Sequence, residues 1–157
     1  MMREIERKFL IPEKPDGLVL HSSAEIRQGY LMTDVTREIR LRDKGGRYSL
    51  AMKQGTGLAR SEVEIELEER QFEKLWPLTE GIRVEKTRHL VDHEDVTIEL
   101  DIFQGALSGL CLAEVEFSTE EEARAFSPPG WFGAEVTEDE RFKNKSLALH
   151  GRPEGER

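Results

Sequence analysis

Hydrophobic and polar residues alternate along much of this chain with a period of two, which is the period of a β-strand. The clearest case runs over residues 60–68, where every second residue is a glutamate and the residues between are Val63, Ile65 and Leu67. A helix would spread those carboxylates around its circumference, whereas a strand places them on one face. Alternation of this kind predicts eight strands, over 4–10, 25–32, 36–42, 47–54, 60–68, 83–91, 96–103 and 110–117.

Helical signals appear in the stretches between and after these strands. Phe72, Leu75 and Trp76 have the spacing of one face of a helix. Hydroxyl residues followed by three glutamates are typical of a helix start, because they suit the positive end of the helix dipole. The three predicted helical regions are 69–78, a region starting at 118–122, and 138–149.

Eight strands and few helices predict a mainly β fold. We expect a closed eight-stranded antiparallel β-barrel forming a tunnel, because closure leaves no strand edge exposed. A few helices would cover its outer face or follow it. The chain length favours one domain over residues 1–150, followed by a polar C-terminal tail over 151–157.

Composition excludes several classes of partner. The net charge is −9, and its summed field repels phosphate at long range, so we expect neither nucleic acid nor an anionic membrane as a partner. Cys111 has no second cysteine with which to form a disulfide, and no run of about eighteen apolar residues is present. The N-terminus carries charge before any apolar run, which is unlike a signal peptide. A cytoplasmic location is therefore expected.

The charged faces of the predicted strands carry the candidate chemistry. For any one strand alone, a half-buried sheet with its charged face in water is the ordinary interpretation. Here, however, the charges of separate strands are sorted into matched groups: Glu4, Glu6 and Lys8; Arg40 and Arg42; Lys53; Arg60, Glu62, Glu64 and Glu66; Lys86 and Arg88; Glu99 and Asp101; Glu114 and Glu116. If those faces point inward, the cations suit phosphate oxygens and the carboxylates suit a hard divalent cation such as Mg²⁺ or Mn²⁺. A metal-bound polyphosphate is the predicted ligand.

These residues resemble a known family. Glu4-Ile5-Glu6-Arg7-Lys8 is similar to the ExExK signature of the CYTH proteins, also called triphosphate tunnel metalloenzymes, and the later groups follow in the family's order. The resemblance covers nearly the whole chain, up to about Leu147. It implies an eight-stranded tunnel in which a triphosphate is processed with a divalent metal.

The resemblance also implies a role for each group. It implies that the metal is held by Glu4, Glu6, Glu114 and Glu116. It implies phosphate contacts from Lys8, Arg40, Arg42, Lys53, Arg60, Lys86 and Arg88, and from Lys145 in a C-terminal segment that closes the tunnel. Glu62 and Glu64 would hold a second metal or orient the attacking water, and with Lys8 they form the expected catalytic set.

Several triphosphates are possible substrates. Inorganic triphosphate is favoured because the sequence shows no obvious set of aromatic residues for stacking a base. The alternatives are a class IV-type adenylate cyclase, a nucleoside or thiamine triphosphatase, and a non-catalytic polyphosphate-binding module. A barrel around an apolar ligand would leave the matched charges unexplained, and His89 and His93 are a weak zinc pair because they lie on a predicted strand and turn. A homodimer is left open as the assembly.

Overall fold

The chain forms one antiparallel sheet of eight strands. It was analysed as a computed structural model that describes residues 5–55 and 61–153. Across the sheet the strands follow the order β1-β8-β7-β6-β2-β3-β4-β5. Their bounds are β1 Ile5–Leu10, β2 Leu20–Thr33, β3 Arg37–Lys44, β4 Arg47–Gln54, β5 Ser61–Leu67, β6 Arg83–His93, β7 Val96–Gln104 and β8 Cys111–Phe117. The prediction of a mainly β, eight-stranded antiparallel fold is confirmed, and the expected strand ends agree to within a few residues except at the start of β2.

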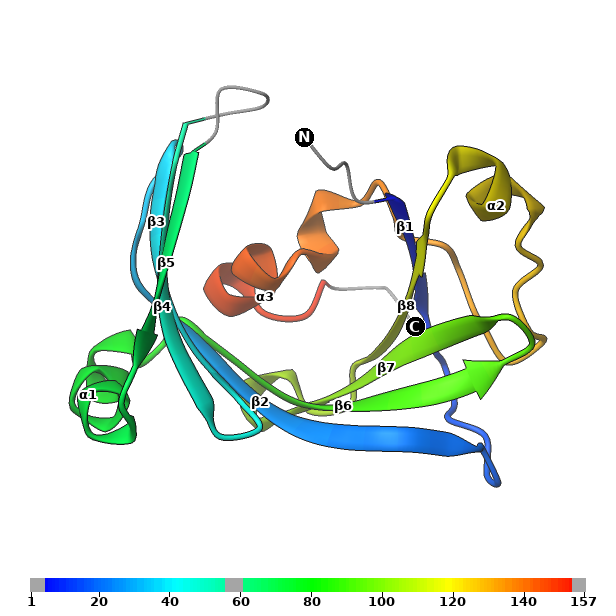
Figure 1. The fold of residues 1–157 in the computed structure, drawn as a ribbon, viewed down its shortest axis with the longest axis horizontal. Coiled ribbons are helices and arrows are strands. Elements are labelled where there is room, and N and C mark those ends of the chain that lie inside the picture. Colours follow the sequence, from blue (N-terminus) through cyan, green and yellow to red (C-terminus); the bar gives the residue numbers. More distant parts are fainter. Residues whose placement is uncertain (1–4, 56–60, 154–157) are drawn as a thin grey trace.

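The sheet is curved but open, so the prediction of a closed barrel is wrong. Its edges are β1 and β5, which do not pair within the part of the chain that the structure describes. Instead, residues 133–136 run along the outer edge of β1: the Leu10 N–H donates to the Ala134 carbonyl at 2.9 Å, and the Val136 N–H donates to the Lys8 carbonyl at 2.8 Å. Each backbone group of β1 used in this way is no longer available to β5. Figure 1 shows the resulting trough.

The helices cover both sides of this trough (Figure 1). On the outer side lie α1, Glu69–Leu75, and α2, Glu120–Ala125, whereas α3, Asn144–His150, lies in the concave side. Among the described residues, three short 3-10 turns complete the fold, η2 Trp76–Thr79, η3 Gly105–Leu107 and η4 Glu140–Phe142. As predicted, hydroxyl and acidic residues start α2: the Glu122 N–H donates to the Thr119 hydroxyl at 3.1 Å. None of the helices among the described residues has the length and apolar character to cross a membrane.

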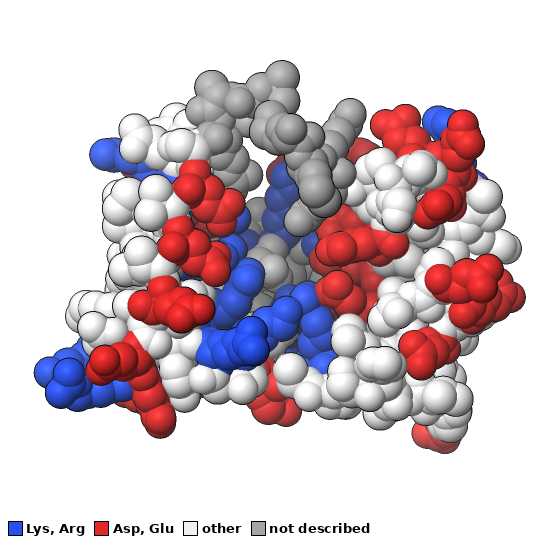
Figure 2. All heavy atoms as spheres, viewed as in Figure 1, with Lys and Arg blue, Asp and Glu red and all other residues white. Residues whose placement is uncertain are grey.

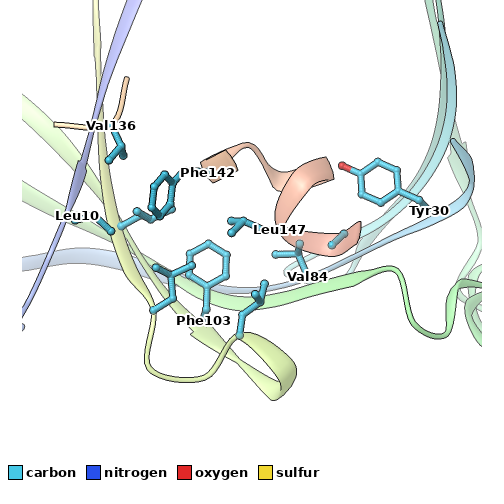
Figure 3. Packing of buried hydrophobic residues seen from close by; sticks show 11 residues of the cluster. Leu10, Tyr30, Val84, Phe103, Val136, Phe142 and Leu147 are labelled. Atoms are coloured by element: carbon cyan, nitrogen blue, oxygen red, sulfur yellow. The ribbon is translucent and has the colours of Figure 1, made fainter. Parts of the chain in front are cut away.

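Two apolar clusters, one on each face, hold the sheet and its helices together. The concave cluster joins α3 and η4 to the sheet through Phe142 and Leu147, which contact apolar side chains at one end of the trough (Figure 3). Its other members are Leu10, Tyr30, Val84, Phe103, Leu107, Leu110, Leu112, Val136 and Ala148. Because side chains two residues apart share a face, this cluster shows which residues face inward. Leu10 and Lys8 share the concave face, as do Val84 and Lys86, so the ionic faces of the central strands point into the trough.

The sequence of β2 does not sort apolar and polar residues onto separate faces, and the structure shows why. Both of its faces are covered: Gln28 and Tyr30 are each 2% exposed on the concave face, and η2 packs against Gly29 on the other. A Cβ atom at Gly29 would lie 2.6 Å from the Thr79 Cβ, so only glycine allows η2 to approach this closely. A strand buried on both faces shows no alternation of apolar and polar residues. The side that faces the trough is the one that carries Gln28 and Tyr30.

Candidate functional site

The sheet register brings the predicted ionic residues into rows across the trough. Glu6 lies opposite Glu116 and Lys8 opposite Glu114. Arg88 lies opposite Asp101, and Lys53 lies between Glu38 and Glu62. Figure 2 shows the outcome: lysines and arginines gather in a central hollow, and acidic side chains flank it on both sides. The trough therefore has a cationic centre between two acidic walls.

A buried ion-pair network lies at the base of the cationic centre. The Lys86 Nζ lies 2.8 Å from Asp101 Oδ2, and these side chains are only 3% and 4% exposed. Arg88 donates two hydrogen bonds to the same carboxylate, at 2.8 and 2.9 Å, and its Nη1 lies 2.8 Å from the Glu99 carboxylate. Asp101 therefore holds Lys86 and Arg88 of β6 in place.

The charges of this network shift the pKa values in opposite senses. Burial lowers the pKa of Lys86 below its ordinary value, and the attraction of Asp101 offsets only part of this effect. Burial alone would raise the pKa of Asp101, but Lys86 and Arg88 outweigh it and hold that pKa below its ordinary value. Burial alone would lower the pKa of Arg88, but the hydrogen bonds and charges of Asp101 and Glu99 raise it. Asp101 thus remains ionised between two cations.

Arg40 and Arg42 on β3 have unused hydrogen-bonding capacity. The Arg40 Nε is buried and has no hydrogen-bond partner among the described residues, and its Nη2 lies 3.6 Å from the Glu64 carboxylate, beyond good hydrogen-bonding distance. Arg42 donates from Nε to the Gln28 Oε1 at 2.9 Å. Burial, followed by repulsion from Arg40, lowers the pKa of Arg42. Two neighbouring guanidinium groups with donors to spare suit the oxygens of an anion.

The acidic wall formed by β1, β8 and the adjacent part of β7 is the candidate metal site. It contains Glu6, Glu114, Glu116 and Glu99 on one face. Lys8 lies 3.1 Å from the Glu114 carboxylate. Burial raises the pKa of Glu99; Arg88 opposes this effect, whereas the charges of Glu114 and Glu116 add to it. Carboxylates gathered on one face provide the oxygen donors and the negative potential that suit a hard divalent cation.

Only part of the expected set of metal-binding residues lies within the described residues. Glu4 lies outside the described residues. Within residues 5–55 and 61–153, no group of three or more His, Cys, Asp or Glu side chains is close enough together to hold a metal ion. The metal-binding roles of Glu6, Glu114 and Glu116 stay predictions, supported by their shared face and by the chemistry of their donors.

The second acidic wall lies on the edge strand β5. Glu62 lies 4.0 Å from the Lys53 Nζ, and Glu64 faces Arg40; these two glutamate side chains are about half exposed. Arg60, which was expected to contact phosphate, lies outside the described residues. The structure therefore brings Glu62 and Glu64 to the rim of the cationic centre, and their expected catalytic role stays a prediction.

The C-terminal segment contacts two of the predicted phosphate-binding lysines. The Lys8 Nζ donates to the Phe142 carbonyl at 3.2 Å, and the Lys86 Nζ donates to the Asn144 Oδ1 at 3.3 Å. Lys145, at the start of α3, is half-buried and makes no hydrogen bond or ion pair with any part of the chain that the structure describes. The contacts of Lys8 and Lys86 place η4 and the start of α3 beside these two lysines, and the phosphate contact expected of Lys145 stays a prediction.

Sequence reasoning missed two features of the site. It did not single out Gln28 or Asn144. The signal for Gln28 was a polar residue between Ile26 and Tyr30 on the apolar face of a strand. His89 accepts from or donates to the Ser23 hydroxyl at 2.6 Å and belongs to no metal-ligating group among the described residues. Cys111 is half-buried, and burial raises its pKa to about 11, in agreement with an inert thiol.

Comparisons with known proteins agree with this arrangement. Residues 2–128 match the CYTH domain family. The chain is 55% identical over 150 residues to the inorganic triphosphatase of Nitrosomonas europaea, covering 94% of this chain and 98% of that protein. It is 35% identical over 154 residues to the inorganic triphosphatase of Acetivibrio thermocellus, covering 94% of each. The crystal structure of the inorganic triphosphatase NE1496 is similar with a TM-score of 0.82 at 53% identity, covering 95% of this chain and 96% of that one.

Proposed function

This chain belongs to the CYTH domain family, and on that premise we propose that it hydrolyses inorganic triphosphate to orthophosphate and pyrophosphate. The observation that carries the proposal is the unused hydrogen-bonding capacity of Arg40 and Arg42 in the trough. A buried donor without an acceptor costs free energy, and a ligand rich in anionic oxygens would remove that cost. Two similar proteins named inorganic triphosphatase support triphosphate as that ligand.

We propose that the enzyme requires Mg²⁺ or Mn²⁺. Glu6, Glu114 and Glu116, with Glu4, would hold the ion, because hard divalent cations prefer carboxylate oxygens. When bound, the ion neutralises phosphate charge and polarises a phosphoryl oxygen. The carboxylates shared between β1 and β8 support this assignment.

The proposed reaction is an in-line displacement at the terminal phosphorus. The water oxygen bonds to phosphorus while the bridging P–O bond breaks, and that electron pair leaves with pyrophosphate. The protein's cations hold the phosphate chain and stabilise its charge; they are Lys8, Arg40, Arg42, Lys53, Arg60, Lys86, Arg88 and Lys145. Glu62 or Glu64 would orient the water and accept its proton, and their half-exposed carboxylates at the rim leave room for that role. Lys8, beside Glu114, would stabilise charge on the transferred group.

The packing of the aromatic residues favours inorganic triphosphate over a nucleotide. In the trough, Tyr30, Phe103 and Phe142 are at most 3% exposed and belong to the concave cluster. On the outer side, Phe117, Phe126, Trp131 and Phe132 pack against one another. Among the described residues, none of these rings is exposed in the trough, where it would be needed to stack a base.

We further propose a homodimer that forms through the outer face of β4 and β5. Met52, Val63 and Ile65 are 46%, 63% and 51% exposed there, beside the unpaired edge of β5. Exposed apolar side chains at a free strand edge are typical of an interface. A cytoplasmic location is also proposed, and the single cysteine, free of any disulfide, supports it.

A phosphate-release panel tests the proposed reaction. Purified protein is assayed with inorganic triphosphate, pyrophosphate, long-chain polyphosphate, ATP and thiamine triphosphate, each without metal and with Mg²⁺ or Mn²⁺. We expect metal-dependent turnover of triphosphate above all others, with one orthophosphate and one pyrophosphate formed per substrate molecule. Hydrolysis of pyrophosphate but not of triphosphate, or formation of cyclic AMP from ATP, would refute the substrate assignment.

A further inference from the structure

We propose that Gln28 is a positioning residue that orients the phosphate-binding guanidinium of Arg42. This inference rests on the proposed function, because it assigns Arg42 to the phosphate chain. Gln28 lies on β2 directly opposite Arg42 on β3, and it is 2% exposed. A buried amide must have its polar groups satisfied, so its partners reveal what it does there.

Both polar groups of the Gln28 side-chain amide are hydrogen-bonded. Its Oε1 accepts a hydrogen bond from Arg42 Nε at 2.9 Å, and its Nε2 donates to the Tyr30 hydroxyl at 2.9 Å. The chemistry of Arg42 fixes which way the amide faces, because an arginine Nε only donates. The carbonyl oxygen of Gln28 must therefore face Arg42, and the amide nitrogen must face Tyr30. Figure 3 shows the Tyr30 oxygen pointing toward the inside of the trough.

This arrangement holds Arg42 by one nitrogen and leaves the other two for a ligand. The terminal nitrogens of Arg42 make no hydrogen bond or ion pair with other described residues. Its neighbour Arg40 points a buried Nε into the same region without a partner. The Gln28 contact thus selects one orientation of Arg42 in the absence of ligand. A side chain that is already oriented loses less conformational freedom on binding.

The contact is neutral on the Gln28 side, which matters for an anion site. A carboxylate at this position would bind Arg42 more strongly but would place a negative charge beside the phosphate oxygens. The amide orients the guanidinium without neutralising it. Arg42 therefore keeps its full positive charge for the ligand.

The test replaces Gln28 and compares the kinetic constants with those of a matched control. Gln28→Leu keeps the side-chain volume and removes the acceptor. Thr79→Val is the control, because Thr79 is also fully buried and also accepts a hydrogen bond from an arginine Nε, that of Arg83, but on the outer side of the sheet. We expect Gln28→Leu to raise KM for triphosphate about tenfold while kcat changes less than about threefold, and Thr79→Val to leave both within about twofold. Should Gln28→Leu fail to fold, Gln28→Met provides a more flexible side chain of similar length.

A double-mutant cycle separates positioning of Arg42 from a general loss of structure. In an Arg42→Ala background, Gln28→Leu is expected to change KM by less than about twofold, because the oriented group is gone. An undiminished effect of Gln28→Leu in that background, or an effect no larger than that of Thr79→Val in the wild type, overturns the inference while leaving the proposed function intact. Wild-type protein that neither binds nor hydrolyses triphosphate overturns both.

Discussion

The Lys86 ammonium lies 2.8 Å from the Asp101 carboxylate at a point where both side chains are at least 96% shielded from water. The same carboxylate accepts two hydrogen bonds from Arg88. A single acid on β7 therefore determines the positions of two neighbouring cations on β6. Because both cations are proposed to bind phosphate, this acid supports the site without itself contacting the ligand.

Asp101→Asn is expected to destabilise the protein. The change leaves Lys86 buried without its counter-charge, and breaking a buried ion pair in this way costs about 3 kcal/mol of unfolding free energy. Urea denaturation of the variant and the wild type measures the loss. Glu99→Gln is the control, because Glu99 also pairs with Arg88 but is more exposed, and we expect it to cost less than about 1 kcal/mol. A loss for Asp101→Asn no greater than that for Glu99→Gln would contradict the assigned role of Asp101.

The stability of the wild type is expected to fall in acid because of the same residue. The pKa of Asp101 is lower in the folded protein than its ordinary value of about 3.9 in an unfolded chain. Its contribution is therefore fully present above about pH 4 and is lost as the pH falls through the lower folded value. Unfolding free energies measured between about pH 5 and pH 2 should decline more steeply for the wild type than for Asp101→Asn. Parallel declines would show that Asp101 is not the titrating group.

Glu116→Gln is expected to abolish metal-dependent turnover without unfolding the protein. The amide keeps the shape of the side chain but removes a negative oxygen donor from the wall that it shares with Glu6 and Glu114. Phosphate release during a Mg²⁺ titration measures the effect, and circular dichroism checks the fold. Glu121→Gln, at an exposed position in the first turn of α2, is the matched control and should behave like the wild type. Full activity of Glu116→Gln would remove Glu116 from the metal set.

Phe142→Ala is expected to detach the C-terminal segment from the trough. Phe142 is 0% exposed in the concave cluster, and removing a buried phenyl ring costs about 3 to 5 kcal/mol. Its carbonyl also accepts from Lys8, so a displaced segment should lower activity as well as stability. Leu149→Ala on α3 is the control; Leu149 is 40% exposed, and we expect a change within about 1 kcal/mol. Thermal unfolding and phosphate release distinguish the two variants.

Val63→Lys is expected to convert the proposed homodimer to a monomer. Val63 is 63% exposed on the edge strand β5, and a lysine on an edge strand opposes pairing with another chain. Sedimentation velocity measures the change in mass. Val35→Lys serves as the control, since Val35 is 90% exposed but lies between β2 and β3 rather than on β4 or β5. A wild type that sediments as a monomer would reject the dimer.

Alternation alone was enough to predict the strands whose two faces differ. In β5 and β7 the acidic residues and the branched residues lie on opposite faces of the sheet, so the sequence pattern follows the fold directly. The pattern did not show which face of β2 is the inner one. Gln28 and Tyr30 are covered on one face, and η2 covers Gly29 on the other. A pattern of polarity carries no information about which face is inner when both faces are buried. The positioning role of Gln28 was therefore outside the reach of sequence reasoning.

Whether the sheet closes into a barrel also could not be predicted from the sequence pattern. Whether β1 pairs with β5 depends on what else occupies the edge of β1, and the segment that does so, residues 133–136, lies outside every predicted strand. The contacts of Phe142 and Asn144 with the two lysines likewise depend on the path of the C-terminal chain across the trough. Local periodicity cannot specify such long-range contacts.

The position of β1 in the sheet also sets the order in which the site can be assembled during synthesis. This strand leaves the ribosome before the other strands, yet its neighbours in the sheet are β8 and residues 133–136. The Lys8 N–H donates to the Thr137 hydroxyl, 129 residues further along the chain. Contacts so distant in sequence form late and slowly, because a long loop must close before they add stability. Glu6 and Lys8 therefore reach their places in the site only after the later parts of the chain have been made. A message that ends before residue 111 would yield a chain that has every cation of β3 and β6 but lacks the β8 carboxylates of the acidic wall.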